Sequence, residues 1–164
     1  MAVRRDSLRP ALVVLATLIA LSLPALLQAQ ADSQLGSWTL NLAKSNYNPG
    51  PAPKSETRVY EPFGKNGVTA RFDRVDAEGH KIAISYSANY DGKDYKYLGS
   101  LDADTVVLKR VDAYTVEATL KKGGTVVQTS SAVVSKDGKT RTLTTSGKNG
   151  KGELFHNVVV FDRQ

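Results

Sequence analysis

The sequence after residue 31 alternates apolar and polar side chains with a period of two, and this alternation is the feature that most constrains the fold. A period of two is typical of a β-strand with one buried face and one face in water. The alternation is clear at 36–42, 67–74, 80–90 and 113–121. No similar stretch after the first 31 residues has the period of an amphipathic helix. The chain is therefore predicted to be all-β.

Residue pairs that favour tight turns separate these stretches, as at Asn66-Gly67, Asp91-Gly92 and Asp137-Gly138. Such pairs accommodate the positive backbone dihedrals of short hairpin loops. We place the predicted strands at 36–42, 56–61, 67–74, 80–90, 94–98, 104–110, 113–121, 125–135, 139–146 and 153–161. Strands joined mostly by tight turns are expected to close into an antiparallel up-and-down β-barrel of about eight to ten strands, because closure removes exposed edges. A two-sheet sandwich remains the alternative.

Residues 46–53 are predicted to be a stiff crossing loop. Pro49, Pro51 and Pro53 surround Gly50 in this segment. Proline has no backbone N–H to donate to a neighbouring strand, so the segment cannot be a central strand.

The first 31 residues have the three parts of a secretory signal peptide. Basic residues at positions 4, 5 and 9 precede an apolar run at 11–27, and small residues at Ala29 and Ala31 follow. We expect cleavage after Ala31, with Ala29 as the second choice. The run is shorter than the roughly 20 residues of a membrane span and contains Pro24, which disfavours a lasting anchor. The prediction is an exported protein, periplasmic or secreted, with a signal peptide at 1–31 and one barrel domain at 32–164.

Composition excludes several classes of protein. The chain has 164 residues, no cysteine and a formal net charge of +6. One domain of ordinary size is expected, and disulfides, zinc-thiolate sites and thiol nucleophiles are excluded. Lysine and arginine are scattered among acidic residues instead of forming the basic stripe that tracks phosphates. Nucleic acid is therefore not an expected partner, and the oligomeric state is left open.

Short motifs resemble the lipocalin and fatty-acid-binding-protein superfamily, the calycins. They are Gly36-Ser37-Trp38 at the start of the first predicted strand and Arg163 at the end of the last. Gly36-Ser37-Trp38-Thr39-Leu40-Asn41 and the segment 49–54 also resemble small secreted bacterial proteins of lipocalin-like type. The resemblance implies a calycin-type barrel in which Trp38 and Arg163 form a pair that closes one end.

The chain also departs from that superfamily. The second lipocalin motif, Thr-Asp-Tyr, is absent, and the interval 42–56 is too rich in proline for the helical lid of the fatty-acid-binding proteins. The Arg-x-Tyr that grips a fatty carboxylate on the last strand of that family has no counterpart, because His156-Asn157-Val158 occupies the region. The resemblance therefore implies neither a helical lid nor a fatty-acid ligand.

Tyrosines near Asp91-Gly92 are the one compositional feature that suggests binding. Tyr86 and Tyr90 share one strand face, and Tyr95 and Tyr97 share a face of the next predicted strand, so the rings are predicted to form a cross-strand ladder. Tyrosine combines an apolar face with a polar tip, which suits the wall of a pocket, although it is also a common filler of sheets. The candidate ligand-binding residues are Tyr60, Phe72, Tyr86, Tyr90 and Arg141.

No motif indicates catalysis or a bound metal or cofactor. His80 and His156 are the only histidines, fewer than the three or four ligands of a usual zinc site. Residues 73–79 lack the spacing of a calcium loop and are better explained as a polar hairpin turn. Neither a nucleophile elbow nor a phosphate-binding glycine loop is present. No catalytic residue, metal ligand or cofactor is assigned.

The sequence therefore predicts an exported, lipocalin-like barrel that binds a small apolar or amphipathic molecule and performs no catalysis. One alternative is a filled barrel that acts through its surface as an envelope protein. A second alternative is a periplasmic enzyme or inhibitor on the same barrel. Small barrels are either filled by side chains or hollow enough for one ligand, and sequence alone does not distinguish the two.

Overall fold

The computed structural model of the protein describes residues 32–164, and the predicted signal peptide lies outside the described residues. The described chain is all-β, and it contains no helix long and apolar enough to cross a membrane. Its strands are β1 (Gly36–Asn46), β2 (Ser55–Phe63), β3 (Gly67–Val75), β4 (Lys81–Asn89), β5 (Asp91–Lys96), β6 (Thr105–Arg110), β7 (Thr115–Lys122), β8 (Thr125–Val134), β9 (Thr140–Lys148) and β10 (Leu154–Arg163).

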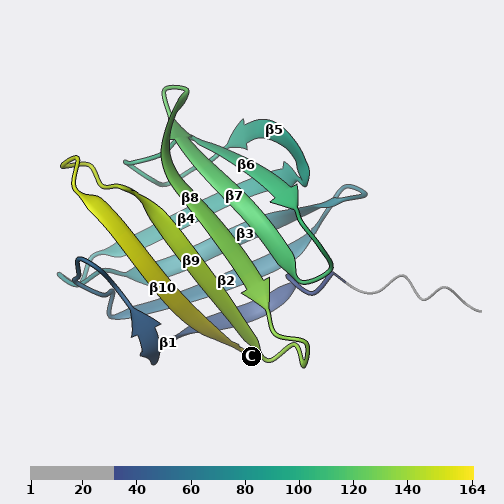
Figure 1. The fold of residues 1–164 in the computed structure, drawn as a ribbon, viewed down its shortest axis with the longest axis horizontal. Coiled ribbons are helices and arrows are strands. Elements are labelled where there is room, and N and C mark those ends of the chain that lie inside the picture. Colours follow the sequence, from purple (N-terminus) through teal and green to yellow (C-terminus); the bar gives the residue numbers. More distant parts are fainter. Residues whose placement is uncertain (1–31) are drawn as a thin grey trace, which may run out of the picture.

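All of these strands belong to a single antiparallel sheet. Each strand pairs with its neighbours in sequence except β4 with β5, and β1 also pairs with β10, which gives the order β4-β3-β2-β1-β10-β9-β8-β7-β6-β5. The sheet curls so that β7 to β10 lie across β2 to β4 (Figure 1). The predicted up-and-down barrel is confirmed, and the sandwich is not formed.

The two remaining edges, β4 and β5, meet at a short seam that nearly closes the barrel. Ser85 on β4 exchanges two backbone hydrogen bonds with Leu98, with N–O distances of 3.1 and 2.9 Å. Gly99 allows this approach, because a Cβ atom there would lie 1.9 Å from the backbone oxygen of Ala83. We call Ser85, Leu98 and Gly99 the seam.

Replacing Gly99 with alanine should lower the free energy of unfolding by about 2–3 kcal/mol, because the new methyl group must displace the backbone of β4. The matched control is Gly92→Ala: the φ angles are +84° and +75°, but a Cβ at Gly92 meets nothing within 4 Å. The control should lose only the ~1 kcal/mol of a left-handed non-glycine residue. Urea unfolding measures both losses, and hydrogen exchange at Ser85 and Leu98 should accelerate only in Gly99→Ala. Equal losses would show that the seam does not depend on close approach.

At the corner between β4 and β5 the structure differs from the predicted turn. Asp91-Gly92 is predicted as the turn, but the corner lies at Tyr90 and both residues belong to β5. The pairing of β5 with β6 shifts its register between Asp91 and Asp94. The positive φ of Gly92 therefore belongs to the irregular start of β5. An Asp-Gly pair suits such an irregularity as well as it suits a tight turn.

One end of the barrel, which we call the base, is closed by packed side chains around Trp38. Trp38 is 0% exposed, and its indole N–H donates a hydrogen bond of 3.1 Å to the backbone oxygen of Gln34. The Arg163 guanidinium lies 4.1 Å from the centre of the Trp38 ring system, and the two residues are partners in the β1–β10 pairing. The closing pair implied by the calycin resemblance is confirmed.

Residues 32–35 precede β1 and run across the base. The Asp32 carboxylate accepts a hydrogen bond of 3.0 Å from the Tyr90 hydroxyl and another from Arg110. Gln34 is almost fully buried. The segment is therefore a floor under the interior of the barrel.

The opposite end, which we call the mouth, is open. Five connections lie at this end: 47–54, 76–80, 97–104, 123–124 and 149–153. All of them except 123–124 contribute residues to the wall of the opening. The first of these is the proline-rich segment, which lies outside any strand, as predicted. A hydrogen bond of 2.7 Å from the backbone N–H of His156 to the backbone oxygen of Asn48 attaches it to β10.

Candidate functional site

The barrel encloses a cavity of about 440 Å³ that opens at the mouth. This volume lies within the range of small-molecule sites. Aliphatic side chains from β4, β6, β7, β9 and β10 cover much of its wall: Ile84, Val106, Val116, Leu120, Leu143 and Val159. The cavity therefore offers an apolar surface to the body of a bound molecule.

Four aromatic rings form a continuous run along the cavity wall. The centroids of Tyr60 and Phe72 are 5.7 Å apart, those of Phe72 and Tyr86 are 5.8 Å apart, and Tyr97 stacks on Tyr86 at 5.8 Å. The predicted contact between tyrosines of neighbouring strands is thus present for Tyr86 and Tyr97. Burial raises the pKa of Tyr97 to about 12, so its hydroxyl keeps its proton at neutral pH.

Arg141 on β9 lies just above the floor and is 5% exposed. Its Nε donates a hydrogen bond of 3.1 Å to Gln34 Oε1, and one terminal nitrogen donates to the Tyr60 hydroxyl. The guanidinium also lies 4.3 Å from the Tyr60 ring centre. Among residues 32–164, no carboxylate forms an ion pair with it. Arginine stays charged in proteins, so Arg141 is a buried positive charge without an acidic partner.

Glu56, Arg58 and Arg74 form a buried ion network higher on the wall. The carboxylate of Glu56 binds Arg58 Nε at 2.6 Å and Arg74 at 2.8 Å. Burial alone would raise the pKa of Glu56, but the two guanidiniums outweigh burial and hold it below its usual value. Burial alone would lower the pKa of Arg58. The negative charge of Glu56 outweighs the effect of burial, so the pKa of Arg58 is raised.

Charges in the cavity below the mouth do not balance. Two carboxylates, Glu56 and, nearer the mouth, Asp102, share the cavity with three guanidiniums, those of Arg58, Arg74 and Arg141. Of these guanidiniums, only Arg141 forms no ion pair within the described residues. A buried charge without a partner is unfavourable, and an anionic group that binds it removes the penalty. The interior is therefore suited to an acid, with Arg141 as its main partner.

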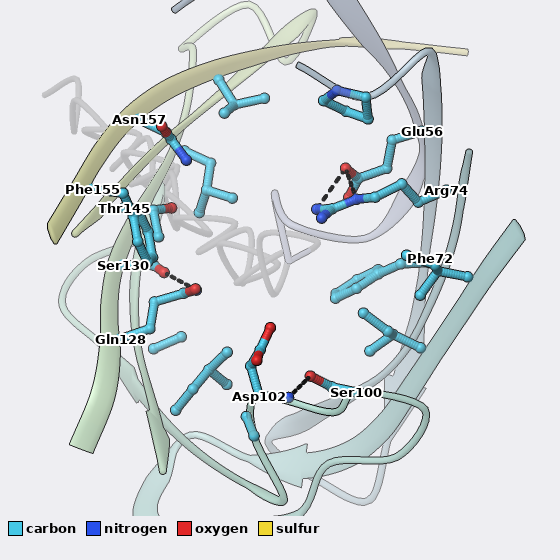
Figure 2. A pocket seen from close by; sticks show the side chains of 18 of the residues that line it. Glu56, Phe72, Arg74, Ser100, Asp102, Gln128, Ser130, Thr145, Phe155 and Asn157 are labelled. Carbon is cyan, nitrogen blue, oxygen red and sulfur yellow. Dashed lines mark hydrogen bonds and ion pairs between the residues drawn. The ribbon is translucent and has the colours of Figure 1, made fainter. Parts of the chain in front are cut away.

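The wall opposite the ion network carries uncharged polar side chains. Figure 2 shows Gln128, Ser130 and Thr145 facing Glu56 and Arg74 across the cavity. Gln128 Nε2 donates a hydrogen bond of 3.2 Å to Ser130 Oγ. This wall offers hydrogen-bonding groups without charge.

Four of the five predicted ligand-binding residues line this cavity: Tyr60, Phe72, Tyr86 and Arg141. The fifth, Tyr90, does not; it lies at the base, where its ring contacts the Arg110 guanidinium at 4.0 Å. Burial raises the pKa of Tyr90, and the charge of Asp32 adds to the effect. Ligand contact by the four lining residues stays a prediction.

Sequence reasoning missed the charged wall residues Glu56, Arg58 and Arg74. A signal was available, because Glu56 and Arg58 share the face of their strand that carries Tyr60. Charged side chains on an inward strand face are uncommon unless they are paired or functional. The pairing partner on β3 could not be predicted without the strand register.

Asp76, Glu78 and His80 are the described residues whose side chains are close enough to share a metal ion, with possible ligand atoms within 4.8 Å of one another. Asp76 Oδ1, however, accepts hydrogen bonds of 2.7 and 2.8 Å from the backbone N–H groups of Gly79 and His80. These contacts are those of a capped hairpin turn, as the sequence indicates for 73–79. Glu78 and His80 are exposed, and we assign no metal to the group.

The described chain has the fold of a calycin-type barrel, nearly closed and with an open cavity, as the sequence motifs predict. No protein-family model and no curated protein matches the chain. Among solved structures, a point mutant of the fluorescent protein UnaG is similar with a TM-score of 0.55 and 13% sequence identity. The match covers 80% of this chain and 96% of the other. At this identity the likeness concerns the fold.

Proposed function

We propose that this protein is an exported carrier that binds one small amphipathic molecule with an anionic head, without catalysing a reaction. The observation that carries the proposal is Arg141, a buried guanidinium at the bottom of an open cavity, with no acidic partner in the described chain. An acid bound there would complete the charge pairing, and its apolar part would lie against the aromatic and aliphatic wall.

The cavity also bears on the alternatives. A filled barrel that acts through its surface would need no interior space, whereas this barrel holds about 440 Å³ and opens to solvent. The carrier is therefore favoured over the filled barrel. Ser146 Oγ lies 2.8 Å from His156 Nδ1, but this contact is exposed and neither residue lines the cavity. The cavity therefore gives an enzyme no specific observation in its favour.

Native mass spectrometry of the protein purified gently from its own host tests the carrier directly. We expect one retained acidic molecule per chain, and a protein mass that begins at Asp32 if export and cleavage after Ala31 occur. A protein that retains no molecule and gives no thermal shift with any lipid or metabolite acid would overturn the carrier. A mass that still includes residues 1–31 would overturn export.

Replacing Arg141 with methionine should weaken the binding of dodecanoate about 10- to 100-fold at neutral pH, because a charge-assisted hydrogen bond contributes about 1.5–3 kcal/mol. The binding of 1-dodecanol, which has the same chain without the charge, should change little. Isothermal titration calorimetry measures both affinities. Arg71→Met is the matched control, since Arg71 is exposed and pairs with Glu61. Equal effects on the acid and the alcohol would contradict the assigned role of Arg141.

A further inference from the structure

Tyr47 carries the one buried side-chain nitrogen or oxygen within residues 32–164 that lacks a hydrogen-bond partner. Tyr47 follows β1 directly, lines the cavity and packs its ring against the core. Buried polar groups in native proteins almost always have a partner. An unpartnered hydroxyl on a residue that lines the cavity therefore marks a position where a bound molecule is expected to supply a partner.

The Tyr47 hydroxyl lies near the ion network of the upper wall. Burial raises the pKa of Tyr47 to about 12, and the negative charge of Glu56 adds to the effect. The hydroxyl thus keeps its proton and can both donate and accept at neutral pH. Glu56 does not compete for a ligand, because its two oxygens already bind Arg58 and Arg74.

The opposite wall carries an uncharged polar side chain, that of Gln128. The amide nitrogen of Gln128 is used by Ser130, and the Gln128 carbonyl oxygen accepts no side-chain hydrogen bond from the described residues. Figure 2 shows the Asp102 carboxylate pointing into the opening between the two walls. A carboxylate there disfavours a second anionic group, so a neutral hydroxyl fits this level of the cavity better.

We propose that Tyr47 marks a second subsite, which binds an uncharged hydroxyl group at the end of the ligand opposite its anionic head. The inference rests on the proposed function, because it takes the head to lie at Arg141. Four residues of β2 separate Tyr60, beside Arg141, from Glu56, and the rise of a strand places the two levels ~13 Å apart. An extended alkyl chain of medium length spans that distance. The ligand class is therefore a hydroxylated amphipathic acid.

The test compares dodecanoate with 12-hydroxydodecanoate by isothermal titration calorimetry on the wild type and on Tyr47→Phe. The wild type should bind the hydroxylated acid about fivefold more tightly, the effect of one net hydrogen bond. Tyr47→Phe should lose this preference, keep its affinity for dodecanoate, and unfold at the same urea concentration or a higher one. Tyr95→Phe is the matched control, because the Tyr95 hydroxyl bonds Asn89 and Asp91 away from the cavity.

Three results would overturn the second subsite while leaving the carrier intact. The first is equal affinity of the wild type for the two acids, and the second is a preference that survives in Tyr47→Phe. The third is tighter binding of dodecanedioate than of 12-hydroxydodecanoate, which would assign the upper level to an anion. Failure of all three acids to bind the wild type would instead count against the proposed function itself.

Discussion

Replacing Glu56 with glutamine should lower the free energy of unfolding by about 3–5 kcal/mol at neutral pH, which is the usual result of breaking a buried ion pair from one side. Glu56 is 1% exposed and forms ion pairs with both Arg58 and Arg74. Without its charge, both guanidiniums remain in the wall of the barrel with no acidic partner. Urea unfolding of the wild type and the variant at pH 7 measures the loss.

The difference in the free energy of unfolding between the wild type and Glu56→Gln should depend on pH. The pKa of Glu56 is lower in the folded protein than its ordinary value of 4.5, so the stabilisation is complete above that value and declines as pH falls through the folded pKa. The difference between wild type and Glu56→Gln should therefore be constant near neutral pH and shrink below about pH 4. Surface aspartates with lowered pKa values are common to both proteins and cancel.

Glu61→Gln is the matched control for Glu56→Gln, because it makes the same substitution on the same strand. Glu61 pairs with Arg71 at 2.5 Å, but both side chains are more than half exposed. Exposed pairs contribute about 0–1 kcal/mol. A loss of similar size in both variants would show that Glu56 is not an interior charge.

Replacing Trp38 with alanine should lower the free energy of unfolding by about 3–5 kcal/mol, as expected for truncation of a fully buried aromatic residue. The substitution removes the ring under Arg163 and the indole hydrogen bond to the floor. Circular dichroism should follow the urea transition, since the variant has no tryptophan to report by fluorescence.

Leu42→Ala on the same strand is the control for Trp38→Ala. Leu42 is 44% exposed, and its truncation should change stability by less than about 1 kcal/mol. A loss below about 1 kcal/mol for Trp38→Ala would contradict the closed base and the role of the Trp38–Arg163 pair.

The strands could be predicted because hairpin folding is largely local. Alternation and turn pairs act between residues close in sequence, and they placed every strand within a few residues. The exception is the end of β1, predicted at position 42 and observed at Asn46. Between Asn41 and Asn46 the pairing with β10 shifts register, and Asn41 binds the backbone N–H of Lys44. Such a bulge interrupts the period of two, so alternation ends before the strand does.

Closure of the barrel depends on contacts that local patterns do not encode. The β1–β10 pairing joins the two ends of the described chain, and the seam joins Ser85 to Leu98 across a corner. These contacts require the coiling of the whole sheet. For this reason the sequence left the choice between barrel and sandwich open.

The candidate site could be predicted only in part, because its contacts also join segments far apart in the sequence. Tyr60 and Arg141 could be proposed from residue type and strand face, but their hydrogen bond joins β2 to β9, and Gln34 reaches Arg141 from outside any strand. Tyr47 lies in a segment whose prolines indicate a loop and nothing about its interior contacts. Residues whose role depends on two distant segments were therefore missed or left without partners.

The floor and the β1–β10 pairing place both described ends of the chain at the base. Trp38 faces Arg163 in the register, and the backbone N–H of Gln164 donates a hydrogen bond of 3.0 Å to the backbone oxygen of Ser37. A reporter, an affinity tag or a solid support attached beyond Gln164 would thus sit on the side of the molecule opposite its opening. The protein can be immobilised in one orientation with every opening facing the solution, a favourable arrangement for capturing a scarce ligand from a cell extract.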